Sequence, residues 1–185
     1  HAKEKGIDVI VTDHHEPPAE GLPPAYAVVD PKRVDCEYPD KNLCGAGITF
    51  KLIQAVLFKK DFGVKPGWEK WFLDLVGLAT LSDMVPLVGE NRVFAYYGLK
   101  VMQKSPRNGL RKLLERLKIS QKHITEDDIA FMITPRINAA SRMGVPVDAF
   151  NLLIADNDAD AIKYAERLDA VNAERKAAVA VLVKE

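Results

Sequence analysis

The stretch "IDVIVTDHHEPP", residues 7–18, carries the strongest fold signal in this chain. It begins with Ile7 to Thr12, a short apolar run rich in β-branched residues, which predicts a buried strand of a parallel sheet. The run ends at Asp13 and two adjacent histidines, after which prolines disfavour further regular structure. We therefore expect polar side chains at the carboxyl end of a strand.

Asp13, His14 and His15 occupy a place where binding sites are common, because ligands of open α/β sheets bind beyond the carboxyl ends of the strands. Imidazole binds zinc, iron, nickel and manganese, and a neighbouring carboxylate favours harder ions. Adjacent residues of an extended chain face opposite ways, so we expect one histidine to reach a metal and the other to remain free for a phosphate or a proton. Alternatively, Asp13 caps a turn and both histidines are ordinary loop residues.

A second candidate carboxylate is Asp83, in "GLATLSDMVPL" (residues 77–87). It follows an apolar helix directly, and a negative charge at the carboxyl end of a helix opposes the helix dipole. Such a position suggests a nearby cation. The alternative is that Ser82 and Asp83 bond to the turn that precedes Pro86.

The remaining pattern favours an α/β fold with many helices after the first strands. A second short strand is predicted at residues 25–31, and glycines 45 and 47 open a helix that runs to about residue 60. Residues 68–81 predict a deeply buried helix, "TEDD" at 125–128 has the form of a capping box, and a long helix starts near residue 157.

Composition excludes some classes of function. Lysine and arginine (26) balance aspartate and glutamate (26), so a nucleic-acid partner would need a local basic patch. No apolar run approaches the roughly 20 residues that span a bilayer, and no signal-peptide pattern is present. Cys36 and Cys44 lack the spacing of zinc or redox motifs, so we expect reduced thiols and a cytoplasmic protein.

Further binding residues are expected in "PRINAASRMG", residues 135–144. Arg136 and Arg142 carry guanidinium groups, which suit phosphate recognition, and Asn138 lies between them. The alternative is that Arg136 pairs with an internal carboxylate and Asn138 caps a helix.

Three other patterns carry weaker signals. "GAG" at 45–47 could present backbone N–H groups to an anion or could serve close packing. The basic helix "RKLLERLK" at 111–118 is typical of a solvated face, with DNA contact as the alternative. The aromatic residues of the apolar helices predict core packing rather than base stacking; they are Trp68, Trp71, Phe72, Tyr96 and Tyr97.

Six blocks together resemble the DHH phosphoesterase superfamily, and within it the bacterial 5′→3′ exonucleases specific for single strands. The blocks are "VIVTDHHEPP", "AYAVVDPKR", "LCGAGITFKL", "GLATLSDMVPL", "PRINAASRMG" and "LDAVNAERK". They run in order along nearly the whole chain, which makes the resemblance far more specific than one three-residue motif.

The resemblance implies hydrolysis of phosphodiester bonds with two divalent ions, Mn²⁺ or Mg²⁺, that clamp the attacking and leaving oxygens. Carried over by position, His14 and Asp83 would be metal ligands. Asp13 would support the site, and His15 would contact the scissile phosphate or assist the leaving oxygen. Arg136, Asn138 and Arg142 would contact phosphate or support the site.

The resemblance also implies a domain organisation. Residues 1–155 would be the carboxyl-terminal part of a DHH-type parallel-sheet catalytic domain with a helical extension. Residues 156–185 would begin a long helix toward a further domain. Two aspartate motifs of the superfamily are expected upstream of His1, and both ends look cut. We therefore expect this piece alone to bind Mn²⁺ weakly and not to hydrolyse DNA.

The implied role is DNA repair and recombination on single-stranded DNA, with a single-strand-binding protein and a helicase as partners and no membrane. Two rival interpretations stay open. One is a relative that cleaves oligoribonucleotides, cyclic dinucleotides or pyrophosphate, although "PRINAASRMG" and the long final helix are unusual in smaller relatives. The other is a non-catalytic scaffold whose metal site has decayed, which the presence of Asp13, His14, His15 and Asp83 weighs against.

Overall fold

A computed structural model describes residues 1–182 of the chain, which divides into two compact units between Gly98 and Leu99. The fold is mostly helical and contains one small parallel sheet, in agreement with the expected α/β class.

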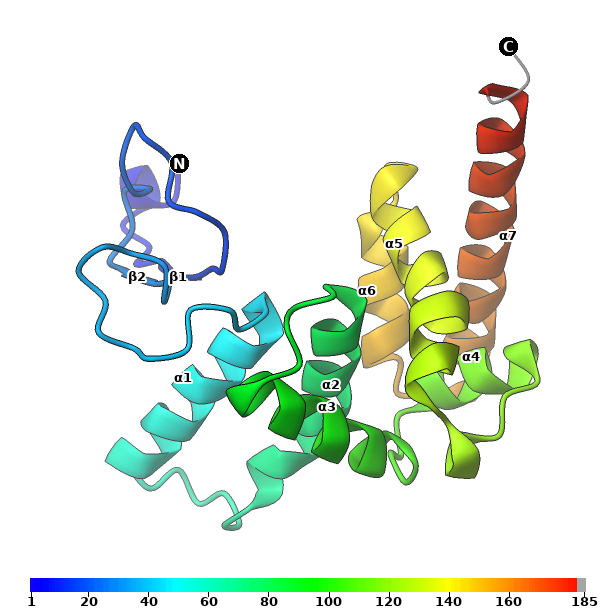
Figure 1. The fold of residues 1–185 in the computed structure, drawn as a ribbon, viewed down its shortest axis with the longest axis horizontal. Coiled ribbons are helices and arrows are strands. Elements are labelled where there is room, and N and C mark those ends of the chain that lie inside the picture. Colours follow the sequence, from blue (N-terminus) through cyan, green and yellow to red (C-terminus); the bar gives the residue numbers. More distant parts are fainter. Residues whose placement is uncertain (183–185) are drawn as a thin grey trace. The chain divides into compact units, whose positions relative to one another are not determined.

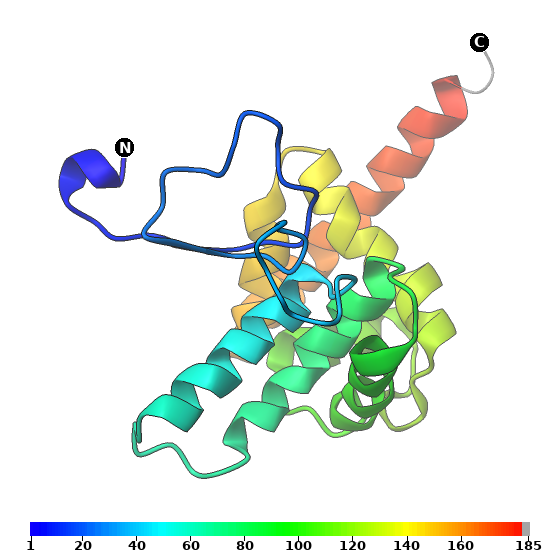
Figure 2. The same ribbon diagram turned by 60° about the vertical axis from the view of Figure 1, so that its left-hand side comes forward.

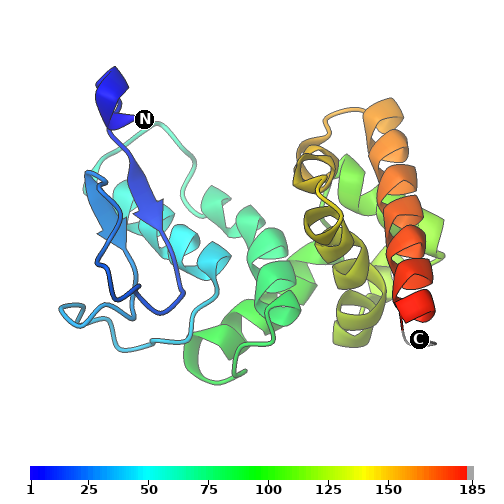
Figure 3. The same cartoon turned by 90° about the horizontal axis from the view of Figure 1, so that it is seen from above.

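The first unit contains the sheet, whose strands β1 (Ile10–Thr12) and β2 (Ala27–Val29) are parallel and pair Ile10 with Ala27 (Figure 3). The parallel direction is as expected, but the prediction of a buried strand from Ile7 is wrong. Ile7 and Ile10 are each 56% exposed. The reason is that the sheet has two strands among the described residues, with α1 packed against β1, so much of its surface faces solvent.

Three α-helices complete the first unit. They are α1 (Gly45–Lys59), α2 (Leu73–Ser82) and α3 (Gly89–Met102), which continues past the unit boundary. A 3₁₀ helix (Trp68–Phe72) precedes α2 and forms the first part of the helix predicted from residue 68. Helices α1 and α2 lie side by side in Figure 2.

The core of the first unit lies where these helices meet. It is formed by Leu43, Ile48, Phe50, Val76 and Phe94. The crossing of α2 and α3 requires glycine, because a Cβ at Gly77 would lie 2.6 Å from the Cα of Gly98. Two backbones in such contact leave no room for a methyl group.

The aromatic residues predicted for this core are largely outside it. Trp68 is 50% exposed, Trp71 41%, Tyr96 58% and Tyr97 53%. Phe72 alone of the five is partly buried and packs against the core. An apolar pattern predicts which residues can be buried, but burial also requires a neighbouring element to cover them.

The second unit is helical (Figure 1). Its α-helices are α4 (Asn108–Leu117), α5 (Thr134–Arg142), α6 (Pro146–Ile154) and α7 (Asp158–Leu182). Helix α7 is the long helix expected from residue 157, and it packs against α4, α5 and α6. The expected extension toward a further domain concerns residues up to 185, of which 183–185 lie outside the described residues.

The capping box at 125–128 is present. Thr125 donates its N–H and its hydroxyl to Asp128 Oδ2 at 3.0 and 2.9 Å, and Asp128 N–H donates to Thr125 Oγ1 at 3.3 Å. A π-helix (Asp128–Ile133) follows and leads into α5, with Pro135 in its first turn. Both cysteines are free, and Cys44 is buried. Within residues 1–182, no helix combines the length and hydropathy needed to cross a bilayer.

Candidate metal centre

Asp13 ends strand β1 and organises the turn that follows it. Its N–H still donates to Val29 O at 3.0 Å, which continues the ladder of the sheet by one residue. Its carboxylate Oδ1 accepts the backbone N–H of His14 at 2.7 Å and that of His15 at 3.4 Å. A carboxylate that accepts amides further along its own chain forms an Asx-type turn, which stops the strand.

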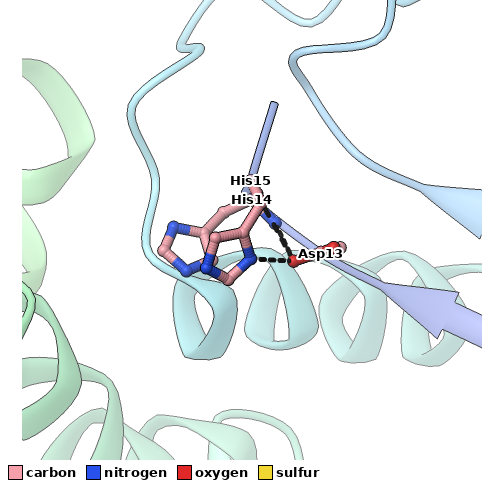
Figure 4. Close-up of side chains that lie close together, drawn as sticks. All are labelled: Asp13, His14 and His15. Carbon is pink, nitrogen blue, oxygen red and sulfur yellow. Dashed lines mark hydrogen bonds and ion pairs between the residues drawn. The ribbon is translucent and has the colours of Figure 1, made fainter. Parts of the chain in front are cut away.

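The same carboxylate oxygen also holds the ring of His15, whose Nδ1 lies 2.7 Å away (Figure 4). This hydrogen bond is the largest cause of the lowered pKa of Asp13, and the two backbone N–H groups contribute in the same direction against partial desolvation. Because Nδ1–H donates to the carboxylate, the Nε2 of His15 is the ring nitrogen that remains for a ligand.

The two histidine rings lie next to each other, which corrects the expectation that they point in opposite directions. Their centroids are 4.4 Å apart at an interplanar angle of 51° (Figure 4). The expectation assumed an extended chain, but regular strand geometry ends at Thr12 and the Asp13 turn follows. Donor atoms of Asp13, His14 and His15 all lie within 4.8 Å of one another.

His14 reaches the second predicted carboxylate, although the two residues are distant in sequence. Its Nδ1 lies 3.3 Å from Oδ2 of Asp83, and the two side chains are 22% and 42% exposed. Asp83 caps the carboxyl end of α2, where its N–H donates to Ala79 O at 2.9 Å. The next residue, Met84, has a φ of 55°, so the chain turns sharply away and leaves the Asp83 carboxylate directed at His14.

The arrangement of these two donors fits a divalent cation. Adjacent ligand atoms of an octahedral ion with bonds of about 2.1 Å lie about 3 Å apart, close to the 3.3 Å between His14 Nδ1 and Asp83 Oδ2. A cation there would also offset the unfavourable position of Asp83 at the negative end of α2. Imidazole with carboxylate suits Mn²⁺, and Mg²⁺ through the carboxylate.

The first turns of helix α1 pack against the site. A Cβ at Gly45 would lie 3.5 Å from Cδ2 of His14, in ordinary contact, so the first turn of α1 packs against that ring. Thr12 and Thr49 share a hydrogen bond of 2.9 Å between their hydroxyls, which joins β1 to α1. Gly47 serves packing, because a Cβ there would lie 3.3 Å from the ring of Phe94.

Arg136, predicted from "PRINAASRMG", lies in the second unit and is engaged by protein groups. Its Nε donates to Asp169 Oδ1 at 2.9 Å and its Nη1 to Met132 O at 2.7 Å. Arg116 Nε donates to the other oxygen of Asp169, also at 2.9 Å. Partial burial opposes ionisation of Asp169, but the two arginines outweigh it and lower the pKa of that carboxyl group. Arg136 therefore pairs with an internal carboxylate, as one of the two sequence-based alternatives states.

Asn138 and Arg142 differ from Arg136 in being exposed. Asn138 lies inside α5 rather than at its start, so it is no helix cap. Its spacing of four residues from Arg142 places both on one helix face, and neither side chain hydrogen-bonds to another described residue. They remain available to a ligand of the second unit.

Sequence reasoning missed Asp169, which joins α7 to Arg116 and Arg136. It lies inside the block "LDAVNAERK", but an aspartate on a polar helix carries no signal of its own. The only available hint was the excess of positive charge in "RKLLERLK" and "PRINAASRMG", which calls for a carboxylate partner.

Comparison with known proteins shows what the chain is similar to. Residues 1–80 match the DHH family, N-terminal domain. The single-stranded-DNA-specific exonuclease RecJ of Bacillus subtilis is 38% identical over 184 residues, which cover 100% of this chain and 22% of that protein. RecJ of Haemophilus influenzae is 41% identical, and the match covers 94% of this chain and 31% of that protein. The chain thus spans between about a fifth and a third of the length of such relatives.

Solved structures that are similar to this chain are also RecJ exonucleases. RecJ of Thermus thermophilus in complex with Mn²⁺ is 34% identical, with a TM-score of 0.81 over 98% of this chain and 26% of that one. A structure of exonuclease RecJ bound to manganese is 33% identical, with a TM-score of 0.82 over 99% of this chain and 45% of that one. The Thermus protein has also been solved with Mg²⁺.

Proposed function

Because residues 1–80 belong to the DHH family and the chain is homologous to RecJ exonucleases along its length, we propose that it forms part of a 5′→3′ exonuclease specific for single-stranded DNA. Its role would lie in DNA repair and recombination. The observation that carries the proposal is the 3.3 Å approach of His14 Nδ1 to Asp83 Oδ2. Two residues singled out independently from sequence thereby provide adjacent donors for one cation.

His14 and Asp83 would hold a divalent ion, Mn²⁺ or Mg²⁺, and two ions are proposed for the intact enzyme. When bound, such ions activate water and neutralise charge on a phosphate. Within the described residues these two side chains supply one donor pair, which is fewer than either ion requires. We therefore expect the 185-residue chain to bind Mn²⁺ weakly and to lack nuclease activity by itself.

The other side chains of the centre would handle the phosphate. His15 turns Nε2 outward while Asp13 holds Nδ1, so His15 would contact the scissile phosphate or, when protonated, donate to the leaving oxygen. Asp13 would fix the ring orientation and tautomer of His15. Its lowered pKa keeps it ionised, as this role requires.

Arg142 and Asn138 are the better candidates for nucleic-acid contact in the second unit, because both are exposed on one face of α5. Arg136 would act mainly as a positioning residue, since Asp169 and Met132 O occupy two of its three nitrogens. Its Nη2 could still donate to a phosphate that approaches from solvent.

The wider context is part of the same proposal. Residues 1–155 would belong to the catalytic domain and 156–185 would begin a connecting helix. Single-stranded DNA would be the substrate, a single-strand-binding protein and a helicase the protein partners, and the cytoplasm the compartment.

The test is a substrate panel on the complete gene product that carries this chain, with Mn²⁺ present. We expect mononucleotides to be released from the 5′ end of long single-stranded DNA, with loss of activity in His14→Ala and Asp83→Asn. Cleavage confined to oligoribonucleotides or cyclic dinucleotides would replace the proposal with the phosphodiesterase alternative. Absence of hydrolysis with every substrate would favour a scaffold.

A further inference from the structure

The last two residues of α1 and the segment that follows them expose an unusual set of side chains. Together they read "FKKDFGVKPGWEKW", residues 58–71, which we call the 58–71 loop. Its four aromatic residues are Phe58 (90% exposed), Phe62 (52%), Trp68 (50%) and Trp71 (41%). Large aromatic side chains normally bury most of their surface, so four residues with this much exposed aromatic surface in one short segment are unusual.

The same loop is basic. It contains four lysines against two carboxylates, and the lysines, at positions 59, 60, 65 and 70, are all exposed. None of them forms an ion pair with a described residue. Of the two carboxylates, Asp61 is engaged within the loop, where its Oδ1 accepts the N–H of Gly63 at 2.8 Å. That bond leaves the Asp61 carboxylate charged, and Glu69 is the second carboxylate, so four lysines against two carboxylates give the segment a formal net charge of +2 that can attract an anionic partner.

Part of this set borders a common hollow. A depression of about 830 Å³ is lined by Phe58, Phe62, Lys60 and Lys65, together with the carboxylates Asp61 and Glu69, whereas Trp68, Trp71, Lys59 and Lys70 lie outside its lining. The ammonium group of Lys60 lies 5.5 Å from the centre of the Phe62 ring, a cation–π contact. Trp68 stands edge-on to Phe72 at 5.3 Å, which leaves part of the indole open to solvent.

We propose that the 58–71 loop binds single-stranded nucleic acid, with bases stacked on its aromatic rings and phosphates paired with its lysines. The choice of this occupant rests on the proposed exonuclease function. Single strands expose both base faces and a phosphate at each nucleotide, and proteins that hold them combine these two residue types. A duplex hides its base faces, and an acidic peptide offers no planar rings at regular intervals.

The position of the loop gives the contact a defined reach. Helix α1 spans 15 residues, or about 22 Å at 1.5 Å per residue. A Cβ at its first residue, Gly45, would lie 3.5 Å from His14 Cδ2, and Phe58 lies in its last turn. A strand stacked at about 3.4 Å per nucleotide would need about seven nucleotides to reach from one end to the other. The loop would therefore retain long strands and have no effect on very short ones.

Fluorescence offers a direct test, because Trp68 and Trp71 are the only two tryptophans of the chain. The 185-residue chain is titrated with a 20-nucleotide oligo-dT in the presence of EDTA. We expect saturable quenching, because stacking of a base on an indole quenches its emission. A tetranucleotide should also quench the tryptophan fluorescence, but at a higher concentration than the 20-mer, since it can contact the loop alone. Duplex DNA or polyglutamate, at the same concentration as the 20-mer, should not quench the fluorescence.

Two variants separate stacking from charge. Phe58→Ala should weaken binding of the 20-mer about five- to 160-fold, the range for loss of one stacked base. Because Phe58 is 90% exposed, its removal leaves the core intact. Lys65→Ala/Lys70→Ala should make the salt dependence shallower by about 1.4 in log–log slope, at about 0.7 per phosphate of a single strand. Tyr26→Ala, an aromatic residue 76% exposed outside the loop, is the matched control and should bind normally.

The outcomes distinguish this inference from the proposed function. Quenching that persists in His14→Ala supports a loop site independent of the metal centre. No quenching by oligo-dT, or unchanged affinity in Phe58→Ala, would overturn the inference and leave the exonuclease proposal standing. Equal quenching by duplex or polyglutamate would also overturn it, because it would reveal a general polyanion surface. In the complete gene product, Phe58→Ala should slow degradation of long strands and leave that of tetranucleotides unchanged.

Discussion

The Asp169 carboxylate joins three helices of the second unit, so its removal should lower the stability of that unit. In Asp169→Asn, the amide can still accept one hydrogen bond from Arg136, but its NH₂ group faces the donor Nε of Arg116. Of these side chains Arg136 is 13% exposed, Asp169 30% and Arg116 38%. The contact of Asp169 with the more buried Arg136 should therefore contribute more to stability than its contact with Arg116.

The expected magnitude follows from this exposure. A largely shielded hydrogen bond to a charged group contributes about 1.5–3 kcal/mol, and a pair at the surface about 0.2–1 kcal/mol. Since asparagine retains one acceptor, we expect Asp169→Asn to lower the free energy of unfolding by about 2 kcal/mol. For a chain of this size that corresponds to a fall in Tm of about 4–8 °C. Differential scanning calorimetry measures it.

The effect should depend on pH in a defined direction. The pKa of Asp169 is lowered in the folded state, so its contribution to stability is present above the unfolded aspartate pKa of about 3.9 and is lost as the pH falls through the lower folded value. The difference between wild type and variant should be constant at neutral pH and should shrink on acidification.

Asp148→Asn is the matched control. Its partner Arg167 lies 3.4 Å away and is 50% exposed, so we expect a change below about 0.5 kcal/mol. If Asp169→Asn proves no more destabilising than Asp148→Asn, the assignment of Asp169 as the junction of α4, α5 and α7 is refuted.

Three further changes probe other parts of the chain. Gly109→Ala should destabilise the second unit by about 3 kcal/mol or more, because the new Cβ would lie 1.7 Å from Leu152 O; an unchanged urea midpoint would contradict this. Met84→Gly should stabilise the chain by about 0.5–1 kcal/mol, because Met84 has a φ of 55°; a lower Tm would show that the turn depends on its side chain. In Glu90→Gln, the raised pKa of Tyr38 should fall part of the way, because burial, the larger cause, remains while the hydrogen bond to a carboxylate is lost; ultraviolet titration of the phenol measures it, and a higher pKa would be inconsistent with the contact.

The parts of the site that sequence could predict are the polar residues that directly follow the end of a predicted strand or helix. A strand followed by Asp13 and His14, and a helix that ends at Asp83, place polar groups at element ends, and the structure brings these ends together. From sequence, a turn capped by Asp13 is an alternative to a binding site. In the structure the turn and the candidate site coexist, because the turn places both histidine rings on one side.

The errors of prediction share a physical origin, which is that burial depends on what covers a residue. Ile10 and Trp68 lie in apolar stretches that resemble core segments, yet Ile10 is 56% exposed and Trp68 50%. From sequence, pairing of Arg136 with an internal carboxylate is one of two open alternatives, and the partner, Asp169, is not identified, because residues 33 positions apart meet only through the packing of α5 on α7. Local patterns determine elements more securely than they determine their neighbours.

The central claim is that His14 and Asp83 bind one cation together, and a double-mutant cycle of Mn²⁺ affinity tests it most directly. Electron paramagnetic resonance of free Mn²⁺ gives Kd for the wild-type chain, His14→Ala, Asp83→Asn and the double variant, with Asp35→Asn as an exposed carboxylate control that pairs with Arg33. We predict that each single variant weakens binding by at least about tenfold and that the double variant is little worse than either. Unchanged affinity in a single variant, or losses that add independently, would contradict a shared site.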